Sequence, residues 1–123
     1  MRRPKTRIVV VAENNVKSRA RVCSHVDQLN CVAVPAASVS EVLEVMRSRR
    51  VDLVLLDLDL LLSEEFDALE AIKQLGPQLP VVIMSLLTTP ALARRMCDRG
   101  VQSFLGKPVQ RDQLAVTLFR YLL

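Results

Sequence analysis

Four residues with the chemistry to handle metals or phosphate stand at the ends of short apolar stretches. Asp57 directly follows four apolar residues, and Ser85 ends another such stretch. Glu13 and Lys107 stand just after two more. A carboxylate held at the end of a buried strand can act as a metal ligand or as a nucleophile. No His or Cys stands among these positions, which argues against hydrolase chemistry of the Ser-His type.

The elements that must position these residues alternate between the period of a strand and that of a helix. Short apolar runs predict strands at 7–12, 31–34, 53–57, 80–85 and 101–105. Helical spacing predicts helices at 16–29, 42–50, 66–75, 90–99 and 114–122. Helices that connect parallel strands must cover both faces of the sheet. We therefore expect an α/β fold, a doubly wound five-stranded parallel sheet with five helices.

The carboxyl edge of such a sheet is where ligands bind. Two carboxylates, Glu13 and Asp57, together with the backbone carbonyl of Asp59, would suit Mg²⁺, a hard cation. Asp57 could then attack a phosphoryl group as a nucleophile. The Lys107 ammonium and the Ser85 hydroxyl would stabilise the phosphoryl oxygens. Lys107 taken alone would more often be a surface cation.

Composition narrows the class of protein. The 123 residues predict one domain, spanning 1–123, and no apolar run approaches the roughly 20 residues of a membrane span. The net charge is +4, but the Arg residues are scattered and Trp is absent, which argues against nucleic-acid binding. Cys23, Cys31 and Cys97 show neither zinc-ligand nor disulfide-framework spacing. We expect a cytoplasmic domain without membrane contact.

The order of these motifs resembles the receiver (response-regulator) domain of two-component signalling, over residues 7–122. The segments that carry the resemblance are VDLVLLD, PVVIMS and FLGKPV. The resemblance implies that Asp57 is the phospho-acceptor and that Ser85 senses the phosphoryl group. It also implies that Lys107 is the lysine of the site and that Phe104 is an aromatic switch, although Phe104 could simply be a core residue.

Two longer segments resemble receivers of hybrid histidine kinases: AENNVKSRARV and GVQSFLGKPVQRDQLAVTLFRYL. This implies a histidine kinase or a histidine phosphotransfer domain as partner, and a domain excised from a longer protein that could itself be a histidine kinase. A homodimer through the face of the fourth helix, fifth strand and fifth helix is a further expectation. Enzymatic activity of the domain would be limited to self-phosphorylation and autodephosphorylation.

Several residues depart from the family's pattern. Ala12 replaces one of two acids usual after the first strand, which weakens the expected Mg²⁺ site; the Asp59 carboxylate is one option for replacing it. Leu61 and Glu65 stand where Pro and Gly are usual, so the loop after Asp57 should be built differently. Leu86 replaces a small residue. A degenerate receiver that binds partners without phosphorylation is therefore an alternative. A flavodoxin-like nucleotide binder is a weaker one, because the first loop lacks glycines.

Overall fold

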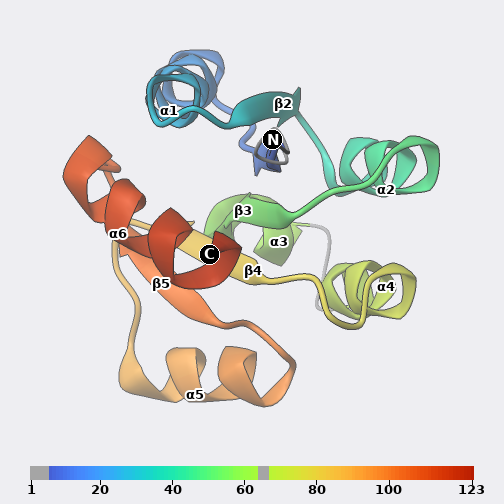
Figure 1. The fold of residues 1–123 in the computed structure, drawn as a ribbon. Coiled ribbons are helices and arrows are strands. Elements are labelled where there is room, and N and C mark those ends of the chain that lie inside the picture. The colour runs from blue at the N-terminus through green and yellow to red at the C-terminus, as the bar shows by residue number, and fades with distance from the viewer. Residues whose placement is uncertain (1–5, 64–66) are drawn as a thin grey trace.

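The computed structural model describes residues 6–63 and 67–123, in which five strands and six helices form one α/β unit (Figure 1). The elements in chain order are β1 (Ile8–Ala12), α1 (Val16–Gln28), β2 (Val32–Ala36), α2 (Val39–Ser48), β3 (Leu53–Asp57), α3 (Leu58–Ser63), α4 (Asp67–Leu75), β4 (Val81–Ser85), α5 (Pro90–Asp98), β5 (Ser103–Gly106) and α6 (Arg111–Leu122). None of the helices in these two ranges is long and apolar enough to cross a membrane.

The five strands form one parallel sheet in the order β2-β1-β3-β4-β5. This confirms the expected doubly wound parallel sheet. β3 lies at its centre, and its residues are all buried. The registers align Ala12 with Leu56 and Asp57 with Met84, so the strands on either side of β3 end beside it at the same edge. Asp57 is therefore held at the end of a central strand that is buried along its whole length.

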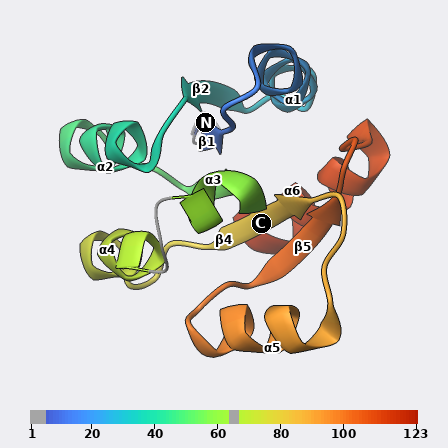
Figure 2. The same ribbon diagram turned by 180° about the vertical axis from the view of Figure 1, so that it is seen from behind.

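Helices cover both faces of the sheet, as Figures 1 and 2 show. On one face, Leu53 and Leu55 pack in a buried cluster with residues of α1 and α6. On the other face, Val54 and Leu56 pack with residues of α2, α3, α4 and α5. Successive side chains of a strand point to opposite faces, so an uninterrupted apolar run is what a doubly covered strand requires.

The helix α3 corrects the expectation of five helices. A loop was expected after Asp57, but a helix begins at Leu58 and runs to Ser63. Leu58, Leu60 and Leu61 are buried, which explains why this segment folds back onto the sheet rather than crossing its edge as an exposed loop. The expected start of the following helix at residue 66 lies outside the described residues.

Three helix N-termini are capped by the side chain of the residue that precedes the helix. The side chains of Asn15, Ser38 and Thr89 accept hydrogen bonds from backbone amides in the first turns of α1, α2 and α5. Such caps satisfy amides that have no partner inside the helix. The Asn15 cap fixes the start of α1 at Val16, three residues after Glu13.

Candidate functional site

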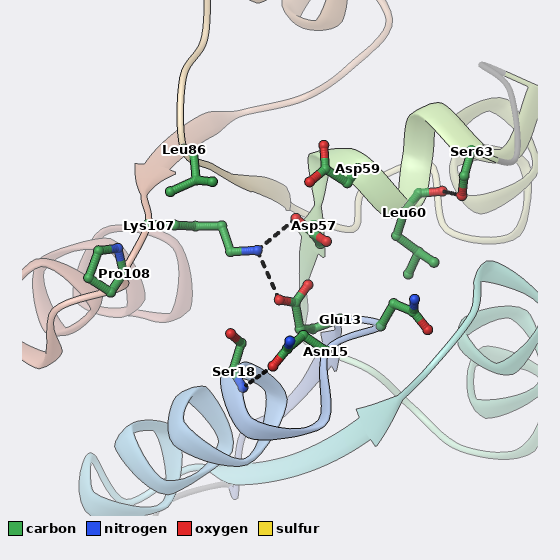
Figure 3. A pocket seen from close by; sticks show the side chains of 11 residues that line it. Glu13, Asn15, Ser18, Asp57, Asp59, Leu60, Ser63, Leu86, Lys107 and Pro108 are labelled. Carbon is green, nitrogen blue, oxygen red and sulfur yellow. Dashed lines mark hydrogen bonds and ion pairs between the residues drawn. The ribbon is translucent and has the colours of Figure 1, made fainter.

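A hydrogen-bonded cluster of Glu13, Asp57 and Lys107 lies at the carboxyl edge of the sheet (Figure 3). The Lys107 ammonium lies 2.8 Å from Oε1 of Glu13 and 3.1 Å from Oδ1 of Asp57. Glu13 is only 1% exposed and Asp57 only 4% exposed. The cluster thus holds two buried carboxylates against one cation, and the structure brings together three of the residues that the sequence suggested.

Backbone hydrogen bonds hold Glu13 and Lys107, the other two residues of the cluster, in place. The amide of Glu13 donates to the carbonyl of Ala36 over 3.0 Å, which extends the pairing of β1 with β2 by one residue. The amide of Lys107 donates to the carbonyl of Ser85 over 2.8 Å, just beyond the pairing of β4 with β5. Both side chains therefore project from backbone that is anchored to the sheet.

The cluster alters the proton affinities of its members. Burial, together with the hydrogen bond and the charge of Asp57, raises the pKa of Glu13 to about 7 against the opposing effect of Lys107. For Lys107, burial lowers the pKa, but hydrogen bonds and charge from the two carboxylates outweigh it and raise the pKa. The cluster thus combines a firmly protonated lysine with a glutamate that changes charge near neutral pH.

One atom of the cluster has no partner and fits a cation. Oε2 of Glu13 is buried and makes no hydrogen bond. An unpaired buried carboxylate oxygen is costly, and a bound metal ion would satisfy it. Mg²⁺ commonly binds through one or two carboxylates and keeps several waters. Glu13 and Asp57 fit that pattern, although no three His, Cys, Asp or Glu side chains in residues 6–63 and 67–123 are grouped to hold a metal ion.

Asp59 lies apart from the cluster. It stands in the first turn of α3, is exposed, and lines the same pocket from the α3 side (Figure 3). Because helical carbonyls point along the helix toward the amide four residues on, the Asp59 carbonyl is directed toward residue 63. The expected loop carbonyl thus belongs to a helix here, and the Asp59 contribution to a metal site stays a prediction.

The cluster opens into a pocket of about 620 Å³. Its remaining lining comes from the start of α1, from α3 and from the segments after β4 and β5: Asn14, Asn15, Ser18, Leu60, Ser63, Leu86 and Pro108. Leu86 lies on the Lys107 side of the pocket (Figure 3). The pocket thus opens the Asp57 and Lys107 side chains toward solvent.

Ser85 lies beside this pocket but does not line it. Its hydroxyl is buried and shares a short hydrogen bond with the hydroxyl of Thr88. The next residue, Leu86, takes the place in the lining. Either hydroxyl can be the donor in the bond between Ser85 and Thr88, so Ser85 can donate to a phosphoryl oxygen only in the arrangement in which Thr88 donates to Ser85.

Phe104, the expected switch residue, is placed away from the carboxylates. It is half-buried in β5 and packs against the apolar cluster that underlies α2 to α5. It also lines a separate pocket with Gln113 and Val116 of α6. This position is compatible with the core interpretation as well as with a switch, so its role stays a prediction.

Arg19 is a residue of the site that sequence reasoning missed. Its guanidinium donates to the carbonyl of Glu13 over 2.8 Å and to that of Asn14 over 3.5 Å. A cation in the first turns of a helix opposes the helix dipole. That mismatch was the available signal that Arg19 has a specific partner, and its effect is to fix the turn that carries Glu13.

Comparison with known proteins gives matches along most of the chain. A family model described as the response regulator receiver domain matches residues 9–119. The autoinducer 1 sensor kinase/phosphatase LuxN of Vibrio campbellii is 32% identical over 77 residues, which are 63% of this chain and 9% of that protein. The regulatory protein LuxO of Vibrio cholerae is 36% identical over 78 residues, 63% of this chain and 17% of that protein.

Solved structures agree in fold. The chemotaxis protein CheY4 of Vibrio cholerae superposes with a TM-score of 0.87 at 19% identity, covering 95% of this chain and 99% of that one. NtrX of Brucella abortus has a TM-score of 0.83 at 26% identity, covering 96% of this chain and 27% of that one. This chain thus corresponds to a small part of LuxN, LuxO and NtrX, and to nearly all of CheY4.

Proposed function

Because the chain belongs to the response regulator receiver domain family, we propose that it accepts a phosphoryl group on Asp57 in a Mg²⁺-dependent reaction. One observation carries the proposal: the Lys107 ammonium bonds both Glu13 and Asp57 at the base of an open pocket. A buried carboxylate beside a fixed cation is suited to receive a phosphoryl group, whose oxygens bring further negative charge.

The transfer needs little covalent chemistry from the protein. Lys107 donates to Oδ1 of Asp57, which leaves the other carboxylate oxygen to form the new bond to phosphorus. The bond from phosphorus to the donor breaks at the same time, and the donor leaves with the electron pair. Lys107 then compensates charge on the phosphoryl oxygens. When bound by Glu13 and Asp57, Mg²⁺ supplies further positive charge at those oxygens.

The partners that suit this activity are phosphohistidine proteins. Receiver domains interact with histidine kinases or phosphotransfer proteins, and the match to LuxN, a sensor kinase/phosphatase, supports a donor of that class. A second copy of the chain, bound through α5, β5 and α6, is a further proposed partner.

A degenerate receiver that binds partners without phosphorylation is a second candidate. Ala12, at the end of β1, stands where receivers usually have a second acid. Its methyl group is fully buried in the apolar cluster on one face of the sheet and supplies no metal ligand. The Ser85 hydroxyl is already bonded to Thr88. Both observations favour a site that is less complete than phosphorylation requires.

An intact-mass measurement separates the two candidates. The protein is incubated with Mg²⁺ and acetyl phosphate, and we expect an increase by the mass of one phosphoryl group. Asp57→Ala should remove the adduct, whereas Asp52→Ala, which replaces an aspartate bonded to the amide of Ile8, should retain it. Absence of an adduct in the unaltered protein, together with no Mg²⁺ binding by calorimetry, would favour the degenerate receiver.

Leu86→Ala is expected to accelerate adduct formation about three- to tenfold, because a smaller side chain leaves more room beside Lys107 for the donor. Leu86 is exposed, so the free energy of unfolding should change by less than about 0.5 kcal/mol. Leu87→Ala is the matched control, since Leu87 is as exposed but does not line the pocket. Equal rates for the two variants would show that Leu86 does not limit access.

A further inference from the structure

A groove lies at the amino edge of the sheet, opposite the edge that carries the carboxylate cluster. Arg7 precedes β1 and Cys31 precedes β2, so this amino-edge groove begins where the two parallel strands begin. Its volume is about 340 Å³, which lies in the range of small-molecule sites. Besides Arg7, the lining is mainly apolar and comes from the segment after α1 and from α6: Leu29, Cys31, Ala115, Leu118, Phe119 and Leu122. None of these residues belongs to the cluster at the carboxyl edge.

The amino-edge groove joins buried and exposed apolar side chains of α6. Leu118 and Leu122 are buried among the core residues and form the floor of the groove. Phe119 also lines the groove but is 69% exposed. An aromatic side chain gains free energy when its surface is removed from water, and the fold leaves that gain unused at Phe119. An apolar ligand that lies on the floor of the groove would cover this side chain.

Arg7 gives the groove a positive charge, because it alone among the described lining residues has a charged side chain. Its guanidinium lies 3.9 Å from Oδ1 of Asp52, a contact too long for a hydrogen bond. Asp52 has closer partners, since it accepts from the amide of Ile8 over 2.8 Å and lies 3.3 Å from Nε of Arg50. Burial raises the pKa of the Cys31 thiol, and the charge of Arg7 opposes this rise, so the guanidinium acts on the groove itself. Two arginines thus share one carboxylate, and the Arg7 end of the groove keeps an excess of positive charge.

We propose that the amino-edge groove binds a small amphipathic carboxylate, of the class of medium-chain fatty acids. The alkyl chain lies against Leu118, Phe119 and Leu122, and the carboxylate accepts hydrogen bonds from Arg7. A guanidinium presents donors whose spacing fits both oxygens of a carboxylate. The apolar lining alone would suit any apolar ligand, whereas the charge of Arg7 selects one that ends in negative charge. This binding is independent of phosphoryl transfer at Asp57.

Titration of the ¹⁵N-labelled protein with octanoate, followed by NMR, tests the site. We expect saturable shifts of the backbone amides of residues 29–31 and 115–122, with a dissociation constant on the order of 1 mM, which is usual for a ligand of this size. Octan-1-ol has the same chain without the charge and should bind at least about threefold more weakly. Absence of saturable shifts at these residues, or octan-1-ol that binds as tightly as octanoate, would overturn the proposal.

Variants separate the two parts of the groove. Arg7→Gln should weaken octanoate binding about three- to tenfold and leave octan-1-ol binding unchanged, because it removes only the charge. Phe119→Ser should weaken both ligands at least about threefold, because both cover its side chain. Val116→Ser is the matched control, since Val116 is 61% exposed on the same helix but does not line the groove. Octanoate binding that neither Arg7→Gln nor Phe119→Ser weakens would place the ligand elsewhere and contradict the proposal.

A second copy of the chain is the other occupant that an apolar groove could take. Sedimentation over the range of protein concentrations used for the titration distinguishes it from the carboxylate. Octanoate affinity should stay constant over this range. An affinity that falls as the protein concentration rises, together with dimers that Phe119→Ser removes, would show that a second copy fills the groove and would overturn the proposal.

Discussion

Lys107→Met is expected to lower the rate of phosphoryl adduct formation on Asp57 by about 100- to 1,000-fold, the usual effect of removing one charge-stabilising donor. Met keeps the length and the apolar stem of the side chain but removes the ammonium. That ammonium is within hydrogen-bond distance of both Glu13 and Asp57. Without the ammonium, no cation at position 107 compensates the negative charge of the incoming phosphoryl oxygens.

The same substitution has a consequence that does not require phosphorylation. Lys107 lowers the pKa of Glu13, against the larger opposing effect of burial. Without it, two buried carboxylates face each other unpaired, so the pKa of Glu13 should rise further and the free energy of unfolding at pH 8 should fall by about 3 kcal/mol.

The rate is measured by intact mass with acetyl phosphate, and stability by urea unfolding. Lys17→Met is the matched control, because Lys17 is an exposed lysine on α1 outside the site. It should change neither quantity. A Lys107→Met variant that forms the adduct as fast as the unaltered protein would show that the ion pair takes no part in transfer.

The convergence of Glu13, Asp57 and Lys107 was predictable because it follows from topology. Parallel strands end at one edge, so residues that follow three of them must lie near one another. The apolar runs that identify β1 and β3 are unambiguous, since these strands are buried on both faces, whereas β5 is shorter and only partly buried. No detail of side-chain packing was needed.

Helix α3 was not predictable on the same grounds. The run from Leu53 to Leu62 is apolar apart from Asp57 and Asp59. Periodicity cannot separate a buried strand from a buried helix within such a run. The helix forms because Leu58, Leu60 and Leu61 fill the core, which is a tertiary effect.

The Ser85 hydroxyl shows a second limit of prediction from the sequence. Sequence places Ser85 at the end of β4 but does not set its rotamer, and a neighbouring hydroxyl at Thr88 competes for its hydrogen bond. Position along the sheet edge was therefore predictable, whereas the direction of the polar atom was not.

Glu13 should make the stability of the metal-free protein depend on pH. The folded protein holds the Glu13 proton up to about pH 7, whereas the unfolded chain releases it near pH 4.5, the ordinary pKa of a glutamate. The folded state therefore binds more protons between these values, and stability falls as pH rises through this window. The full cost is present above pH 7. At about 1.4 kcal/mol per pKa unit, the shift from 4.5 to about 7 makes this cost at most about 3 to 4 kcal/mol.

Glu13→Gln should remove this dependence, because Gln cannot release a proton but can still accept the hydrogen bond from Lys107. Urea unfolding at a series of pH values gives the difference between the two proteins, which isolates Glu13 from other acids. Glu44→Gln, on the exposed side of α2, is the control and should follow the unaltered protein. A difference that stays constant from pH 4.5 to 8 would contradict the raised pKa of Glu13.

Mg²⁺ should oppose the loss of stability that follows ionisation of Glu13 as the pH rises. The cation binds the ionised form of Glu13 and satisfies its unpaired Oε2. Affinity measured by calorimetry should rise with pH up to about pH 7 and then level off. Glu13→Gln should weaken binding by about 10- to 100-fold, and Asp59→Asn by less, because Asp59 is exposed and outside the cluster. If Asp59→Asn instead weakened binding as much as Glu13→Gln, the α3 carboxylate would be the ligand that compensates for Ala12.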